Sequence, residues 1–129
     1  MGKWINDDAL DAGLKAVIDN CNKLFLCSAQ PTTYAEASSD FALAEQDLTT
    51  GDGNGDYTIA DGDSSGRKAT VAAQQIASAD ADGTATHVAL CDSANSKLWY
   101  VAITGTSFPV VSGQPVNVDA FAVNFADVV

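Results

Sequence analysis

Residues 83–104 hold the clearest pattern in the chain, two apolar segments on either side of a short polar turn. Successive side chains of a strand point to opposite faces, and in both segments each face receives apolar side chains. The turn, Asp92–Ser96, is rich in Asp and Asn, which tolerate left-handed backbone and bond to their own main chain. The pattern predicts a central β-hairpin. Because both faces are apolar, we expect it in the middle of a sandwich or covered sheet rather than at an exposed edge.

An amphipathic pattern over residues 6–20 predicts the one helix of the chain. Asn6 or Asp7 can cap its start, and acidic residues in the first turn suit the positive end of the helix dipole. Its apolar stripe consists of Leu10, Leu14, Val17 and Ile18. A single helix of this kind must lie on something, either the sheet of its own chain or a neighbouring subunit.

Further short apolar segments recur about every ten residues with turn signals between them, which is typical of a β-sandwich or barrel. The segments are 23–28, 43–48, 57–60, 67–75, 106–111 and 114–125, while 32–44 resembles a surface connection. We therefore predict a mainly β fold, a β-sandwich of Ig-like or jelly-roll-like type with one N-terminal helix. The length of 129 residues indicates a single domain. Within it we expect a helical arm over residues 1–22 and a β body over 23–129.

Composition narrows the classes of partner. Apolar residues make up 47% and charged residues 18% of the chain, which is typical of globular proteins. The net charge of −11 argues against a nucleic-acid-binding surface, because phosphates require basic clusters. No apolar run is long enough to span a bilayer, so no membrane partner is expected. Acidic residues occupy the place of a signal peptide's apolar segment, and we expect synthesis and folding in a cytoplasm.

Side chains with catalytic potential are few. The three cysteines, Cys21, Cys27 and Cys91, have neither disulfide-framework nor zinc-site spacing, and the last two fit apolar strands as small hydrophobic residues. His87 is the one histidine, and we interpret it as a strand residue rather than a general base. The sequence therefore predicts no enzyme and no resident cofactor.

One loop has calcium-ligand spacing. Asp52, Asn54, Asp56 and Asp63 occupy positions 1, 3, 5 and 12 of a calcium-binding loop of the helix-loop-helix kind. Tyr57 stands where that loop needs Gly, and no helix is expected to enter it. The alternative is a solvated pair of Asp/Gly turns.

Aromatic residues offer a second alternative of this kind. Trp4, Trp99, Tyr100 and Phe108 could form a face that stacks on sugars, although alternating aromatic residues in strands more often belong to a core. A calcium-dependent or carbohydrate-binding module is therefore one hypothesis for the function.

Four runs of the chain carry a family resemblance: residues 4–14, 21–37, 57–74 and 83–92, in that order. Together they resemble a family of small virion accessory proteins of tailed bacteriophages. The segment GDGNGD before Tyr57 departs from the family pattern, which has a shorter loop there, so a metal site in it would be particular to this chain.

The resemblance implies a virion component without a catalytic activity. We expect a capsid decoration or cement protein that binds the major capsid protein or other virion proteins, with a homo-oligomer as a further option. A neck, tail or fibre-associated subunit is the alternative in the same setting. The residues expected to contact the partner are Leu10, Leu14 and Val17 of the helix, or Phe125 and Val128 of the C-terminal tail.

Overall fold

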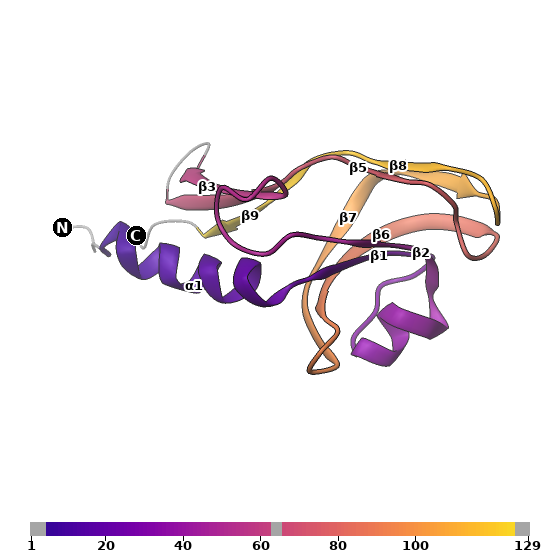
Figure 1. The fold of residues 1–129 in the computed structure, drawn as a ribbon, viewed down its shortest axis with the longest axis horizontal. Coiled ribbons are helices and arrows are strands. Elements are labelled where there is room, and N and C mark those ends of the chain that lie inside the picture. The colour runs from indigo at the N-terminus through magenta and orange to yellow at the C-terminus, as the bar shows by residue number, and fades with distance from the viewer. Residues whose placement is uncertain (1–4, 63–65, 126–129) are drawn as a thin grey trace. The chain divides into compact units, whose positions relative to one another are not determined.

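The computed structural model describes residues 5–62 and 66–125 (Figure 1). Within these ranges it contains one N-terminal α-helix, a π-helical turn and three antiparallel sheets, so the prediction of a mainly β fold is confirmed. The elements are α1 (Asp7–Asn20), β1 (Lys23–Cys27), η1 (Glu36–Asp40), β2 (Ala42–Asp47), β3 (Tyr57–Asp61), β4 (Arg67–Val71), β5 (Gln74–Ile76), β6 (Gly83–Asp92), β7 (Lys97–Val110), β8 (Val116–Val118) and β9 (Phe121–Phe125). No helix in the described ranges is long and apolar enough to cross a bilayer.

The chain divides into two compact units, each built from separate stretches of sequence. One unit contains α1 and the sheet β3-β4-β9, and the other contains the sheets β2-β1-β6-β7 and β5-β8. The helix therefore belongs with three strands that follow much later in the chain. The division found is not the expected one into an arm over residues 1–22 and a body over 23–129.

In the first unit, α1 begins with a side-chain cap and lies on its own sheet. The side-chain oxygen Oδ1 of Asn6 accepts a hydrogen bond of 2.7 Å from the backbone N–H of Asp8. The stripe of Leu10, Leu14, Val17 and Ile18 is buried, and the helix packs against β3, β4 and β9. Burial of this stripe supplies most of the stability that a short helix lacks alone.

This packing corrects the expectation that the helix stripe contacts a partner. Leu10, Leu14 and Val17 are at most 8% exposed, so the sheet of the same chain already covers them. Phe125 is half-buried, and a Cβ placed on Gly13 would lie 2.5 Å from its Cε2 atom, so the ring lies against the helix. Val128 lies outside the described residues.

In the second unit, β1 and β6 are the central strands of the four-stranded sheet. Phe25 of β1 faces Ala89 of β6 in the register, and both belong to a buried cluster on one face. The segment before β2 contains η1 rather than only an irregular connection, and its Tyr34 ring meets the Phe25 ring edge-on at 6.2 Å. The cluster consists of Phe25, Cys27, Ala37, Ala89 and Cys91, with Tyr34, Phe41, Ala42, Leu98 and Val101 packed against it.

The predicted hairpin is present as β6 and β7. In its turn the buried Asp92 accepts hydrogen bonds from the backbone N–H of Ala94 at 3.1 Å and from Nδ2 of Asn95 at 2.6 Å. The second strand is longer than predicted, because 106–110 continues β7. The expectation that the hairpin avoids a sheet edge is wrong for β7, which among the described residues is the last strand of its sheet.

Two other predicted strands are each divided between sheets. The segment 67–75 contains β4 and β5, and the segment 114–125 contains β8 and β9. The breaks fall at Ala72 and Ala73 and at Asp119 and Ala120, where the chain passes from one unit to the other. Neither break contains a Pro or a Gly.

Candidate binding surface

Strand β7 forms one edge of the four-stranded sheet, and its chemistry is unusual for this chain. It pairs with β6 on one side, and no strand of the described residues pairs with it on the other. Lys97 is its one charged residue, and residues 98–118 contain no Asp, Glu, Lys or Arg. In a chain of net charge −11, another protein surface can approach this stretch without meeting acidic side chains of the stretch itself.

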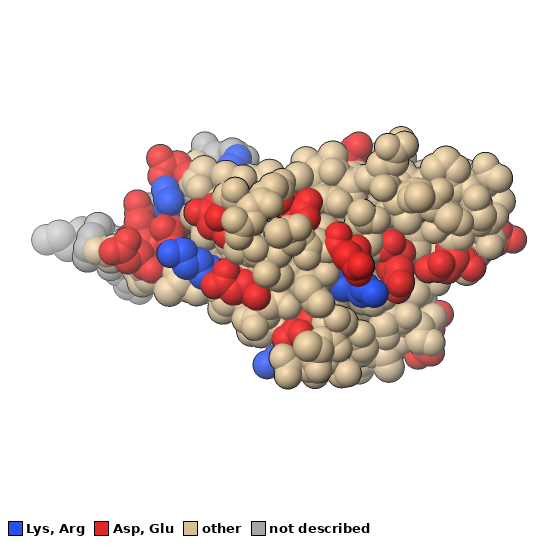
Figure 2. Space-filling view, in the orientation of Figure 1, with Lys and Arg blue, Asp and Glu red and all other residues tan. Residues whose placement is uncertain are grey.

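We call residues 98–111 the neutral edge. Of the described residues, the large hydrophobic side chains that are exposed are Ile103, at 73%, and Val111, at 54%, and both lie in it. A shallow hollow of about 210 Å³ lies at the end of this stretch and is lined by Phe108–Val111 and by the uncharged residues Gln114, Pro115, Val116 and Asn117 that follow it. Figure 2 agrees with this distribution, since the upper right of the view, where Figure 1 places β8 and the end of β7, is largely free of red acidic atoms.

The opposite edge, β2, is protected in the way that soluble proteins usually protect sheet edges. Its Glu45 and Asp47 side chains are 47% and 86% exposed. Each carboxylate lies 3.4 Å from Nζ of Lys23 on β1. Charged side chains on an edge strand disfavour pairing with another strand. The neutral edge has no charged side chain, and Lys97, just before it, is the one charge of strand β7.

Irregularities in the pairing of β7 limit the part that could accept a further strand. Trp99 is an extra residue opposite the step from Leu90 to Cys91, and residues 104–107 form an insertion next to Ile103. Within that insertion Gly105 has a φ of 87°, a value that L side chains rarely adopt. The longest regular stretch of pairing is Tyr100–Ile103, with a bulge at either end. A second one, Phe108–Val110, contains Pro109, which has no backbone N–H to donate to a further strand.

The aromatic residues predicted to form a sugar-stacking face are only partly accessible to a ligand. Trp99, Tyr100 and Phe108 lie on β7 and are half-buried. The ammonium group of Lys97 lies 4.8 Å from the centre of the Trp99 ring, which is cation–π geometry. Trp4 lies outside the described residues. The carbohydrate hypothesis stays a prediction.

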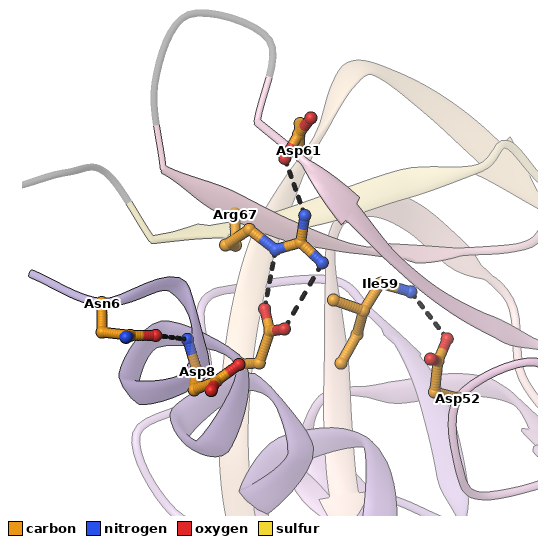
Figure 3. A network of polar contacts seen from close by, with 7 residues as sticks. Asn6, Asp8, Asp52, Ile59, Asp61 and Arg67 are labelled. Carbon is orange, nitrogen blue, oxygen red and sulfur yellow. Dashed lines mark hydrogen bonds and ion pairs between the residues drawn. The ribbon is translucent and has the colours of Figure 1, made fainter.

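The predicted calcium loop is held together by its own side chains. Oδ1 of Asp52 accepts a hydrogen bond of 2.8 Å from the Ile59 backbone N–H (Figure 3), and Oδ2 of Asp56 accepts one of 2.6 Å from that of Thr49. Nδ2 of Asn54 donates to the Thr50 carbonyl oxygen at 2.9 Å. Asp63, the fourth predicted ligand, lies outside the described residues. Within 5–62 and 66–125, no three His, Cys, Asp or Glu side chains group closely enough to hold a metal ion, and calcium binding stays a prediction.

Figure 3 also shows an ion network that sequence reasoning did not find. Arg67 of β4 reaches Asp11 of α1, with Nε 2.8 Å from Oδ1, and Asp61 of β3, with Nη1 2.7 Å from Oδ1. The hydrogen bonds with Asp11, and then those with Asp61, raise the pKa of the Arg67 guanidinium. Arg67 pairs with both carboxylates, and each carboxylate pairs with Arg67, which is typical of an ion network with a structural role.

Within residues 5–62 and 66–125, the cysteines and the histidine show no arrangement for nucleophilic catalysis. All three thiols are fully buried, and desolvation raises the pKa of Cys21 and Cys91 to about 12 and that of Cys27 to about 11. At neutral pH such thiols are protonated, whereas the thiolate is the reactive form. Nδ1 of His87 lies 2.8 Å from the hydroxyl oxygen of Thr86 in the same strand.

Comparison of the chain with protein-family models, with curated proteins and with solved structures finds no match.

Proposed function

We propose that this protein is a non-enzymatic structural protein of a phage virion, and that it decorates the capsid and stabilises the head shell. The neutral edge is the observation that carries this proposal. It combines an edge strand with both exposed large hydrophobic side chains of the described residues, and a hollow lined by uncharged residues borders it. Exposed apolar side chains on an uncharged sheet edge favour contact with another protein.

The chemistry of the neutral edge favours a protein partner over the other classes. It lacks the basic residues that phosphate groups require, which disfavours nucleic acid. Its pairing positions at Tyr100–Ile103 can accept a strand or loop from a neighbouring protein by main-chain hydrogen bonds. Ile103 can then be buried against the partner, and a central buried hydrophobic side chain commonly dominates the affinity of such a contact.

The resemblance of four sequence runs to small virion accessory proteins of tailed bacteriophages supplies the identity of the proposed partner. A head shell presents many identical copies of one capsid protein, so a single contact is repeated over the whole lattice. A protein that binds the assembled shell and not its dissociated subunits stabilises the shell by mass action. This role requires a pre-formed binding surface and no catalytic residues.

Binding of the purified chain to purified phage heads that lack it tests the proposal. We expect the chain to sediment with the heads and to saturate them at a level fixed by the capsid lattice. We also expect decorated heads to release their DNA at a higher temperature than bare heads. Failure of the chain to bind heads, while it binds isolated necks or tails, would replace capsid decoration by the neck, tail or fibre-associated role.

A further inference from the structure

The loop between β2 and β3 contains a reactive Asn-Gly pair that the proposed binding role does not require. Asn54 is the one asparagine of the sequence that is followed by glycine. It is exposed at the tip of the loop, between Gly53 and Gly55. A glycine after asparagine has no side chain to shield its backbone nitrogen, which leaves the neighbouring side-chain carboxamide open to attack.

The backbone around Asn54 has room to rearrange. Gly53 and Gly55 have φ angles of 79° and 114°, and a Cβ added to either would meet no heavy atom within 4 Å. Among the described residues, the Asn54 side chain makes one hydrogen bond, from Nδ2 to the Thr50 carbonyl oxygen, and the Gly55 N–H makes none. The tip is therefore held at its base by Asp52 and Asp56, and at Asn54 by a single solvent-exposed hydrogen bond.

We propose that Asn54 is a site of spontaneous deamidation, which converts this loop to a more acidic form as the protein ages. A base removes the proton of the Gly55 backbone nitrogen, and that nitrogen attacks Cγ of Asn54. The new C–N bond closes a five-membered succinimide, the Cγ–Nδ2 bond breaks, and ammonia leaves. Water then opens the ring at one of its two carbonyl carbons, giving aspartate or isoaspartate without any change of oxidation state.

The competing asparagine on a tight turn is better protected. Asn95 precedes Ser96, whose side chain hinders ring closure, and Nδ2 of Asn95 is tied to the carboxylate of Asp92 at 2.6 Å. The backbone N–H of Asn95 also points to Asp92, at 3.3 Å. Asp92 thus holds both the backbone and the side chain of Asn95, so Asn95 is a matched internal control.

The Asp-Gly pairs of the chain form the same ring more slowly, because each carboxylate in the structure is already engaged. Asp52 accepts a hydrogen bond from Ile59, Asp61 pairs with Arg67, and Asp82 accepts from the Ser112 backbone N–H at 2.7 Å. An engaged, ionised carboxylate is a poor target for the neighbouring nitrogen.

Deamidation places a third carboxylate between those of Asp52 and Asp56 and adds one negative charge to the net −11. Isoaspartate also lengthens the backbone by one atom, which a tip of glycines can accommodate. The reaction depends only on this loop, so it stands or falls separately from the proposed binding role. A virion protein is not replaced after assembly, and there the modified form would accumulate.

Tryptic peptide mass spectrometry of the native protein, after incubation at mildly alkaline pH, tests the inference. Cleavage after Lys23 and Arg67 gives peptide 24–67, which contains Asn54 and no other asparagine, and cleavage after Lys68 and Lys97 gives 69–97, which contains Asn95. We expect 24–67 to gain about one dalton with time and to become a substrate for an isoaspartyl methyltransferase, while 69–97 stays unchanged.

The variant Asn54→Gln supplies the control for the site, because its longer side chain closes a six-membered ring far more slowly. We expect it to abolish the mass gain in peptide 24–67 and to leave the melting temperature unchanged, since residue 54 is exposed. A wild-type peptide 24–67 that gains mass no faster than 69–97, or a gain that persists in Asn54→Gln, would overturn the inference.

Discussion

Arg67 and Asp11 form a two-point ion pair that joins strand β4 to helix α1, with Nε 2.8 Å from Oδ1 and Nη2 3.4 Å from Oδ2. Both side chains are 20% exposed, so the pair is partly shielded from solvent. A guanidinium held by both oxygens of one carboxylate has a fixed orientation as well as a favourable charge contact. The pair thus ties the helix to the sheet through side chains outside the apolar stripe.

Replacing Asp11 by Asn should lower the melting temperature by a few degrees, because Arg67 then loses its main charged partner in a half-shielded position. The matched control is Asp61→Asn. Asp61 contacts the same guanidinium but is 86% exposed, and exposed ion pairs contribute little. Equal effects of the two variants, measured by circular dichroism, would contradict the structural role of the Asp11 contact.

The contact between Gly13 and Phe125 gives a second test of how the helix packs. Alanine is favoured over glycine in a helix interior by about 1 kcal/mol. In this chain Gly13→Ala should nevertheless lower the melting temperature, because its Cβ would lie 2.5 Å from the Phe125 ring. In the background of Phe125→Leu, the same substitution should raise it. A stabilising effect of Gly13→Ala in the wild-type chain would show that the ring does not lie on the helix.

The buried thiols predict both low reactivity and a loss of stability at high pH. Desolvation raises the pKa values of Cys21, Cys27 and Cys91 from 9.0 to between about 11 and about 12. Above pH 9 the unfolded chain releases these protons and the folded chain keeps them, so the free energy of unfolding falls as pH rises from 9 toward 12.

A thiol reagent at pH 8 should label none of the three cysteines before unfolding and all of them in denaturant. Rapid labelling of any one in the native protein would contradict its burial.

The sequence predicted the elements whose signals are local. The stripe of the helix and the turn at Asp92–Ser96 depend on residues a few positions apart, and both are present as expected. The pairing of Arg67 with Asp11 joins residues 56 positions apart and has no local signal. Nor does any Pro or Gly mark the points, near Ala72 and Asp119, where the chain leaves one unit for the other.

The position of β7 shows a second limit of sequence reasoning. The alternation of apolar side chains predicts which side chains are buried. It does not predict whether a strand has a hydrogen-bonded neighbour on each side. The apolar character of Leu98–Ile103 therefore suggested a covered strand, whereas the structure leaves it at an edge. In the proposed function a partner supplies the cover that the chain itself does not.

Removal of divalent cations tests the prediction of a calcium loop. The Asp52 and Asp56 carboxylates already accept hydrogen bonds from backbone N–H groups, so we expect the same melting temperature in calcium and in a chelator. A melting temperature that is higher in calcium than in the chelator, with the difference lost in Asp52→Asn, would contradict this expectation. It would return the calcium-dependent module as the leading hypothesis.

The neutral edge is tested by adding a charge to it. Ile103→Lys should weaken binding to phage heads about tenfold or more, because burying a lysine at the contact costs at least ~1.4 kcal/mol. Ile103 is 73% exposed, so the variant should fold normally. Thr58→Lys, which adds the same charge at an exposed position of β3, in another sheet, is the control and should bind as the wild type does. Equal binding of both variants would exclude the neutral edge as the contact.

The number of copies of this chain in each purified particle tests the central claim most directly, by quantitative mass spectrometry against the major capsid subunit. Capsid decoration predicts a ratio of about one, or about one to three, because the protein then follows the capsid lattice. A few copies in each particle would contradict decoration and favour the neck or tail, and complete absence from particles would contradict a virion role altogether.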